Sequence, residues 1–302
     1  MFWPIQSAIS QGILWGIMTL GVYITFRVLN FADLTVDGSF TLGGGISAIL
    51  VANGMVPVMA LPVAILGGML AGLCTGLLTT KMRIPGLMAS ILTQIALYSI
   101  NLRIMRSPNV PLLRIATMFT QAADLGVPAR WVTLVIGILV AVLVMGIMYW
   151  FFGTEIGSSI RATGDNPDMV RAQGINTDTT TILALVLGNG LVALSGGLIA
   201  QQQGYADIGM GAGTIVVGLA SIIIGEIVFP RSNFFFRLIG AVIGSAVYRV
   251  IIAFVLDWGM KPSDLKLFTA IVVALALFMP SLRSRLSLRW QKSANVRGKP
   301  HA

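Results

Sequence analysis

Long apolar segments recur along the whole chain, and they constrain its fold more than any other feature. A bilayer core of about 30 Å takes roughly 20 helical residues to cross. Of the 302 residues, 56% are hydrophobic and only 10% are charged, which excludes an ordinary soluble domain. The sequence therefore predicts an all-α polytopic membrane protein with a single transmembrane domain over residues 1–302.

About nine spanning segments are expected. Six are long enough to cross a membrane as helices, near residues 7–26, 57–78, 86–105, 131–152, 180–200 and 236–256. Three more are shorter or interrupted by glycine, near residues 39–54, 211–229 and 265–281. Gly43, Gly44 and Gly45 each weaken a helix by roughly 1 kcal/mol. We therefore expect the 39–54 span to break at these glycines and to line a cavity.

Basic residues set the expected orientation. If successive spans alternate, thirteen of the twenty lysines and arginines fall on one side, six of them in a basic tail at 283–302. Because such residues concentrate in the cytoplasm, we expect the N-terminus outside and the C-terminus inside. The net charge of +9 is then explained by topology and membrane lipid, and nucleic-acid binding is not expected.

The longest polar interruption, residues 153–178, contains a short helix with signals at both ends. Its start is marked by a capping residue, a proline at the first helical position and an acidic side chain in the first turn: Asp165 or Asn166, Pro167 and Asp168. Gly174 supplies a left-handed stop. Two helical turns are unstable alone in water, so we expect this cytoplasmic segment to dock on a partner.

Residues 106–130 form the longest loop on the other side of the membrane. Pro108, Pro111 and Pro128 prevent a continuous helix there. Two interpretations stay open, a re-entrant connector and a docking surface for an external protein.

Few residues of this chain can carry chemistry. Cys74 is the single cysteine and His301 the single histidine, so a disulfide framework, a thiol metal site and histidine-based catalysis are not expected. No nucleotide-binding loop is present. We expect no enzyme activity, no metal and no cofactor in this chain, and any ATP with its magnesium would bind to a separate subunit.

Only two charged residues lie clearly within predicted spans, Glu226 and Arg249. They belong to opposite halves of the membrane, so a direct pair is not expected. The sequence is compatible with an Arg249 side chain that reaches outward to Asp257 or the lipid headgroups, and it does not assign a role to either residue.

Polar residues near the interrupted spans are candidates for a transport pathway. These candidates, with two glycines, are Asn30, Asp33, Ser39, Thr41, Gly43, Gly44, Gln94, Asn189 and Asp207. Ala-Asp-Leu at 32–34 and Ala-Asp-Ile at 206–208 each precede a glycine-rich span on opposite sides, as an inverted repeat would. A match this short is equally compatible with chance.

Three stretches resemble the permease subunits of bacterial ATP-binding-cassette (ABC) importers related to branched-chain amino-acid permeases. Leu-Asn-Phe-Ala-Asp at 29–33, followed by Gly-Ser-Phe at 38–40, resembles their early Asn-Phe-Ala segment, although those proteins usually have His-Gly in place of Asp33-Leu34. Residues 160–176 resemble their cytoplasmic coupling segment. Residues 96–105 are similar to a segment of tryptophan-type importer permeases.

The resemblance implies a permease domain in the bacterial cell membrane that forms a homodimer. Two ATPase subunits would lie below it and an extracytoplasmic substrate-binding protein above it, with an aromatic or hydrophobic amino acid as substrate. Residues 153–178 would be the coupling loop, contacting the ATPase through Arg161, Gly164, Asp165, Asn166, Pro167, Asp168, Arg171 and Gly174.

Two other functions compete with an ABC permease. A secondary transporter driven by an ion gradient would need a carboxylate ion site, for which Asp33, Asp37 and Asp207 are the candidates. A membrane-embedded enzyme is disfavoured, because the buried residues offer no nucleophile with a base and no paired carboxylates.

Overall fold

The computed structural model describes residues 2–124, 126–230 and 233–257, with residues 267, 270, 271 and 274. Its elements are α1 (Phe2–Val22), η1 (Tyr23–Val28, a π-helix), α2 (Thr35–Ala52), α3 (Pro57–Thr80), α4 (Gly86–Met105), β1 (Asn109–Pro111), α5 (Met118–Asp124), α6 (Ala129–Phe152), α7 (Glu155–Asp165), α8 (Pro167–Ala172), α9 (Thr177–Gln203), β2 (Tyr205–Asp207), α10 (Thr214–Val228) and α11 (Phe234–Asp257).

The described elements confirm an all-α polytopic fold. Seven helices in these ranges are long and apolar enough to cross a membrane, namely α1 with η1, α2, α3, α4, α6, α9 and α11. The apolar helix α10 is shorter, at 15 residues. The number of nine spans stays a prediction, because the segment at 265–281 and the tail at 283–302 lie outside the continuously described residues.

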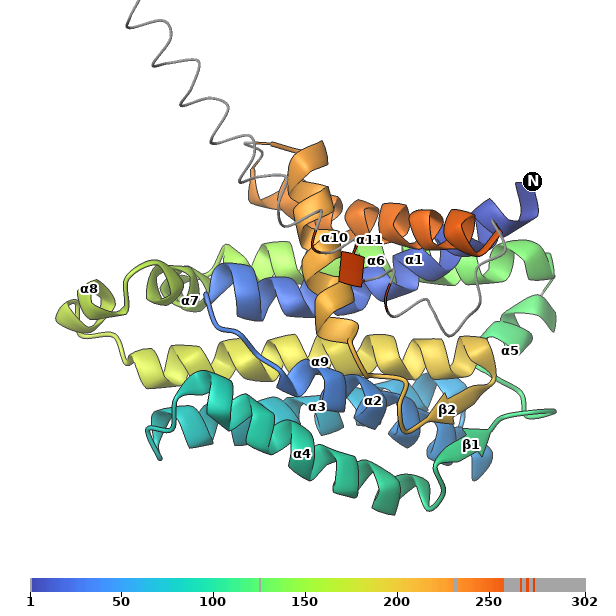
Figure 1. Ribbon diagram of the computed structural model, residues 1–302, viewed down its shortest axis with the longest axis horizontal. Helices are drawn as coiled ribbons and strands as arrows, with labels where there is room; N and C mark the ends of the chain where they lie inside the picture. Colours follow the sequence, from blue (N-terminus) through green and yellow to red (C-terminus); the bar gives the residue numbers. More distant parts are fainter. Residues whose placement is uncertain are drawn as a thin grey trace, which may run out of the picture.

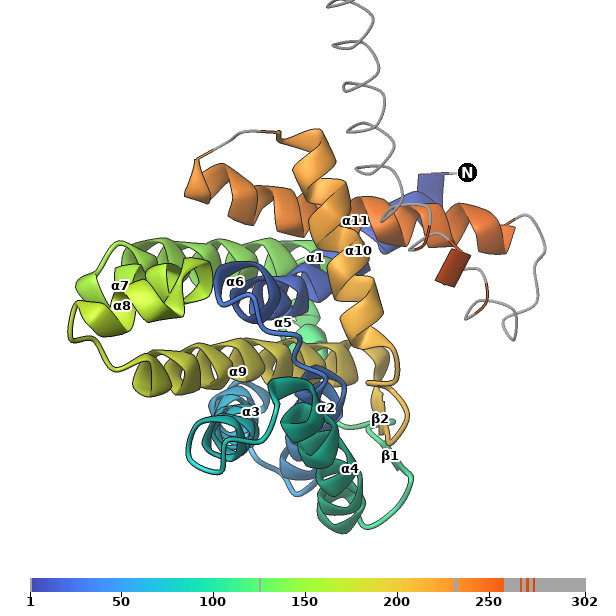
Figure 2. The same ribbon diagram turned by 60° about the vertical axis from the view of Figure 1, so that its left-hand side comes forward.

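Helix α9 lies at the centre of the bundle, with α2 and α3 packed along it and α1 on another side (Figure 1). Helix α11 runs beside α1, and α10 crosses the bundle steeply against α11 (Figure 2). Leu14, Phe40 and Leu198 are completely buried where α1, α2 and α9 meet. By contrast, α4 and α6 each bury one face and expose apolar side chains on the other, as helices that face lipid do.

Helix α2 is continuous from Thr35 to Ala52, so the expected break at Gly43, Gly44 and Gly45 is wrong. A Cβ atom at Gly43 would overlap the backbone of Ala193 on α9, and one at Gly44 would meet Met210. The glycines therefore allow two helices to approach closely, which offsets their low helix propensity. The interruption of regular helix lies earlier, at residues 29–34, between η1 and α2.

The two ends of the bundle have different structures. At one end, β1 pairs antiparallel with β2, with Asn109 opposite Asp207. This pairing joins the 106–130 loop, which is not one continuous helix, to the connection between α9 and α10. At the opposite end of α9, α7 and α8 form a helical projection (Figure 1). We refer to these as the sheet end and the α8 end.

Candidate functional site

A hydrogen-bonded polar cluster lies among the apolar helices, near the middle of α9. The side-chain amide of Asn189 donates to a carboxylate oxygen of Asp33 at 2.7 Å and accepts from the Ser39 hydroxyl at 2.7 Å. The backbone amide of Thr35 donates to the other Asp33 oxygen at 2.9 Å, and the Thr35 hydroxyl contacts that of Thr75 at 2.7 Å. All five side chains are buried. The cluster fixes the non-helical 29–34 segment against α9.

Apart from this cluster, a set of hydrogen bonds to Asp37 joins α2 to the start of α10. Helix α10 has Gly213 as its N-cap, which offers no side chain. The carboxylate of Asp37 fills that role by accepting from the backbone amides of Gly213 at 2.9 Å and Ile215 at 3.0 Å, and from the Thr214 hydroxyl at 2.8 Å. One carboxylate thus satisfies the exposed amides of a helix that starts within the bundle.

The structure brings together only some of the pathway candidates. Asp33, Ser39 and Asn189 share the polar cluster, and the Thr41 hydroxyl accepts from the backbone amide of Gly211 at 3.1 Å. Gly43 and Gly44 lie in the contact between α2 and α9. The other three lie elsewhere: Asn30 is exposed with a positive φ of 56°, Gln94 is half-buried on α4, and Asp207 lies in β2.

The two tripeptides that suggested an inverted repeat occupy different positions relative to their helices. Asp33 lies two residues before α2, whereas Asp207 lies seven residues before α10. The inverted repeat stays a prediction.

At the α8 end, the short helix begins and ends where the sequence predicts. Asn166 is its N-cap and accepts from the backbone amide of Met169 at 3.1 Å, Pro167 is its first residue, and Gly174 follows it with a φ of 83°. Val170 is buried, whereas Asp168 and Met169 are exposed. Asp165 is exposed at the last position of α7. Helix α8 therefore packs inward with one residue and presents the rest outward.

Helix α7 connects α8 to the transmembrane bundle. A Cβ atom at Gly164 would overlap the carbonyl of Val28, so α7 lies directly against η1. Arg161 donates to the carbonyl of Phe152 at 2.8 Å, and its guanidinium lies 5.6 Å from the centre of the Phe234 ring. Arg171 donates to the Thr177 hydroxyl at 2.8 Å. Both arginines therefore stabilise the α8 end through contacts with other residues of this chain.

Glu226 and Arg249, the two charged residues within predicted spans, contact residues that are distant in the sequence. Glu226 pairs with Arg27 at 2.6 Å. The guanidinium of Arg249 lies 4.0 Å from the centre of the Trp15 ring, a cation–π contact inside the bundle. The interpretation that Arg249 reaches outward to Asp257 or the headgroups is therefore wrong.

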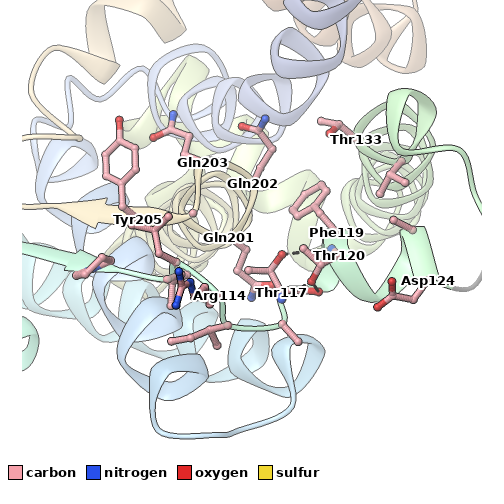
Figure 3. Close-up of a pocket in the computed structure, with 18 of the residues that line it drawn as sticks. Arg114, Thr117, Phe119, Thr120, Asp124, Thr133, Gln201, Gln202, Gln203 and Tyr205 are labelled. Carbon is pink, nitrogen blue, oxygen red and sulfur yellow. Dashed lines mark hydrogen bonds between the residues drawn. The ribbon is translucent and has the colours of Figure 1, made fainter.

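A cavity of about 900 Å³ opens at the sheet end, where α5, the preceding loop and the last turn of α9 meet (Figure 3). Its wall is both polar and apolar, with Arg114, Asp124, Gln202, Tyr205 and Phe119 among the lining side chains. Its size is in the range of small-molecule sites. The predicted 106–130 loop is thus a folded wall of this cavity.

Comparison with known proteins decides among the functions considered. Residues 5–280 match the family described as the permease component of the branched-chain amino acid transport system. The chain belongs to this permease family of ABC transporters. The permease is 40% identical to a tyrosine transport system permease protein of Clostridioides difficile, over 89% of this chain and 88% of that protein. It is a multi-pass membrane protein, and a permease component is not itself catalytic.

A less similar permease and one solved structure also match this chain. The permease is 28% identical to a ribose import permease protein of Haemophilus influenzae, over 59% of this chain and 55% of that protein. Its fold matches the solved structure of PsaBC from Streptococcus pneumoniae in complex with a Fab, with a TM-score of 0.52 and 92% of each chain covered, at 14% identity. At that identity the structural match concerns the fold alone.

Proposed function

We propose that this permease imports an amino acid with an aromatic or hydrophobic side chain across a bacterial cell membrane, as a homodimer. The observation that carries this substrate class is the 40% identity, over nearly the full length, to a protein named as a tyrosine transport permease. Branched-chain permeases usually have His-Gly where this chain has Asp33-Leu34, which weakens the assignment of a branched-chain substrate. The basic-residue bias supports a cytoplasmic C-terminus and an external N-terminus.

Helix α8 is the proposed docking element for a separate ABC ATPase. Its six residues are too few to be stable alone, and it presents Met169, with 48% of its surface exposed, next to Asp168. An apolar side chain at the outer face of a short projecting helix fits a groove on a partner protein. That ATPase would bind ATP and Mg²⁺, and the permease would supply no catalytic group.

Movement of the docked α8 would reach the membrane through α7 and η1. The close contact of Gly164 with Val28 ties α7 to η1, and the Arg27–Glu226 pair ties η1 to α10. Packed helices move as rigid bodies because their cores do not deform continuously. Closure of the ATPase pair would therefore displace η1 and α10 together and switch access to the pathway at the dimer interface.

The sheet end would face the external substrate-binding protein. Its cavity is about 900 Å³ in volume and offers a concave surface with one positive side chain, Arg114, and one negative side chain, Asp124. Such a surface suits a partner that delivers a zwitterionic amino acid.

The test is purification of the permease from its native membrane in mild detergent, with mass-spectrometric identification of its partners. We expect an ABC ATPase to be recovered with the wild-type chain and to be lost with Met169→Asp. Leu113→Asp is the matched control, because Leu113 is 81% exposed at the opposite end. Recovery of the permease alone, still transporting substrate in vesicles without ATP, would instead favour the ion-coupled alternative.

A further inference from the structure

Another cavity, of about 800 Å³, lies at the α8 end of the bundle. Its wall is formed by the end of α3 and the turn to α4, by the start of α9, by Leu29 and Phe31, by Thr163 of α7, and by Pro167 and Arg171 of α8. Hydroxyl groups make up much of the wall, from Thr79, Thr80, Thr163, Thr177 and Thr181. The cavity differs from the polar cluster of Asp33 and Asn189, which is buried near the middle of α9.

The charge of this cavity is positive. Lys81, Arg83 and Arg171 line it, against the single carboxylate of Asp178. Arg171 is partly engaged, since its Nε donates to Thr177 at 2.8 Å. Lys81 and Arg83 are exposed and form no ion pair with a carboxylate in the described part of the chain. Two cations are therefore available to an anion entering the cavity.

The surroundings of the cavity are apolar and face the membrane. Met82, between Lys81 and Arg83, is 69% exposed. Leu87 and Met88 in the first turn of α4 are 52% and 61% exposed. Because α3 and α4 both qualify as membrane spans, the cavity lies where one end of the hydrocarbon layer gives way to headgroups. Helix α8 projects beyond the turn from α3 to α4 (Figure 1).

We propose that this cavity binds the headgroup of an anionic phospholipid, with its acyl chains along the exposed apolar side chains of α3 and α4. Phosphate oxygens accept charge-assisted hydrogen bonds from lysine and arginine, and basic pockets between spans at the membrane surface select anionic headgroups. The adjoining side chains of Met82, Leu87 and Met88 would contact the acyl chains of the same molecule whose headgroup fills the cavity, a contact that a soluble anion does not make. The proposal does not require the ATPase partner, although Pro167 and Arg171 of α8 line both the cavity and the proposed docking element.

The test is native mass spectrometry of the purified full-length permease after exchange into micelles with equal amounts of phosphatidylglycerol and phosphatidylcholine of the same chain length. We expect the wild type to retain phosphatidylglycerol preferentially. Lys81→Gln with Arg83→Gln should weaken that retention by roughly fivefold for each charge removed. The charge-preserving exchange Lys81→Arg with Arg83→Lys should keep it. Arg103→Gln with Arg106→Gln, at the other end of α4, should also keep it.

Other outcomes would overturn the proposal. Equal retention by the wild type and the Lys81→Gln, Arg83→Gln variant would exclude this cavity as the lipid site. Displacement of the lipid by inorganic phosphate at an equal concentration would identify a free-anion site instead. If the double variant lost a co-purifying ATPase and kept its lipid, the cavity would belong to the protein interface. Recovery of the ATPase with the wild type tests the proposed function separately.

Discussion

The guanidinium of Arg27 lies 2.6 Å from the carboxylate of Glu226, joining the π-helical end of the first span to the end of α10. The two side chains keep 50% and 34% of their surface exposed. A pair this accessible contributes at most about 1 kcal/mol to stability. Its importance lies in its position, because η1 also contacts α7, and π-helical turns are frequent at functional sites.

Reversing either charge of this pair should uncouple α10 from η1. We expect Arg27→Glu or Glu226→Arg to lower ATP-driven amino-acid uptake in proteoliposomes several-fold, with little change in the amount of folded protein. The combined exchange should restore most of the uptake, because it re-forms the pair with opposite polarity. Unchanged uptake in both single variants would show that movement does not pass through this contact.

Gly174→Val should impair transport without preventing membrane insertion. Gly174 has a φ of 83°, and no atom lies within 4 Å of a Cβ built there, so the substitution acts on backbone conformation alone. A β-branched residue disfavours this conformation by more than the roughly 1–2 kcal/mol typical of other residues. The end of α8 should therefore shift. The measurements are ATP-driven uptake and ATPase recovery.

Gly126→Val is the matched control for that experiment. Gly126 has a φ of 95° and equally open surroundings, but it lies at the sheet end. Loss of ATPase recovery in both variants would contradict a specific role for α8.

Removing the carboxylate of Asp37 should destabilise the start of α10. Asp37→Ala deletes the acceptor for two backbone amides and one hydroxyl, and loss of an N-cap costs about 0.5–2 kcal/mol. We expect a lower thermal unfolding midpoint in detergent. Asp165→Ala, which removes an exposed carboxylate from the end of α7, should leave the midpoint nearly unchanged. Equal midpoints for the two variants would exclude a capping role.

The sequence predicts features that depend on neighbouring residues. The ends of α8 follow from Asn166, Pro167 and Gly174, because capping, proline and left-handed glycine act within a few positions. The seven described helices that are long and apolar enough to cross a membrane likewise follow from length and apolarity. Gly68, Gly72 and Gly76 recur every four residues on α3, a spacing that indicates close helix packing, and a Cβ atom at each would meet residues of α9.

Contacts between residues that are far apart in the sequence cannot be predicted from local patterns. Asp37 caps a helix that begins 177 positions later, and no local pattern pairs them. The sequence predicts a break of α2 at Gly43 and Gly44, but the low helix propensity of these glycines is offset by close contact with α9. The sequence predicts Asn189 and Asp33 as pathway residues, but only the three-dimensional structure shows that their side chains form a hydrogen bond with each other.

Loss of the Asn189 amide should destabilise the permease more than loss of the Ser39 hydroxyl. Asn189→Ala removes both the donor to the buried Asp33 side chain and the acceptor of the Ser39 hydroxyl, and each buried polar group left without a partner costs about 1–3 kcal/mol. Ser39→Ala leaves only one such group, the Asn189 side-chain oxygen, without its donor. Thermal unfolding in detergent measures both, with the exposed Asn53→Ala as control. A larger effect of Ser39→Ala would contradict the order of bonds in the cluster.

Gly43→Ala should separate α2 from α9, whereas Gly146→Ala should not disturb the fold. A methyl group at Gly43 overlaps the carbonyl of Ala193, while no atom lies within 4 Å of one at Gly146 on α6. Overpacking of this kind costs about 1–3 kcal/mol. The same substitution at Gly146 improves helix propensity by up to about 1 kcal/mol. The unfolding midpoints of the two variants in detergent should therefore move in opposite directions, and a shared direction would mean that the approach of α2 to α9 is not limited by Gly43.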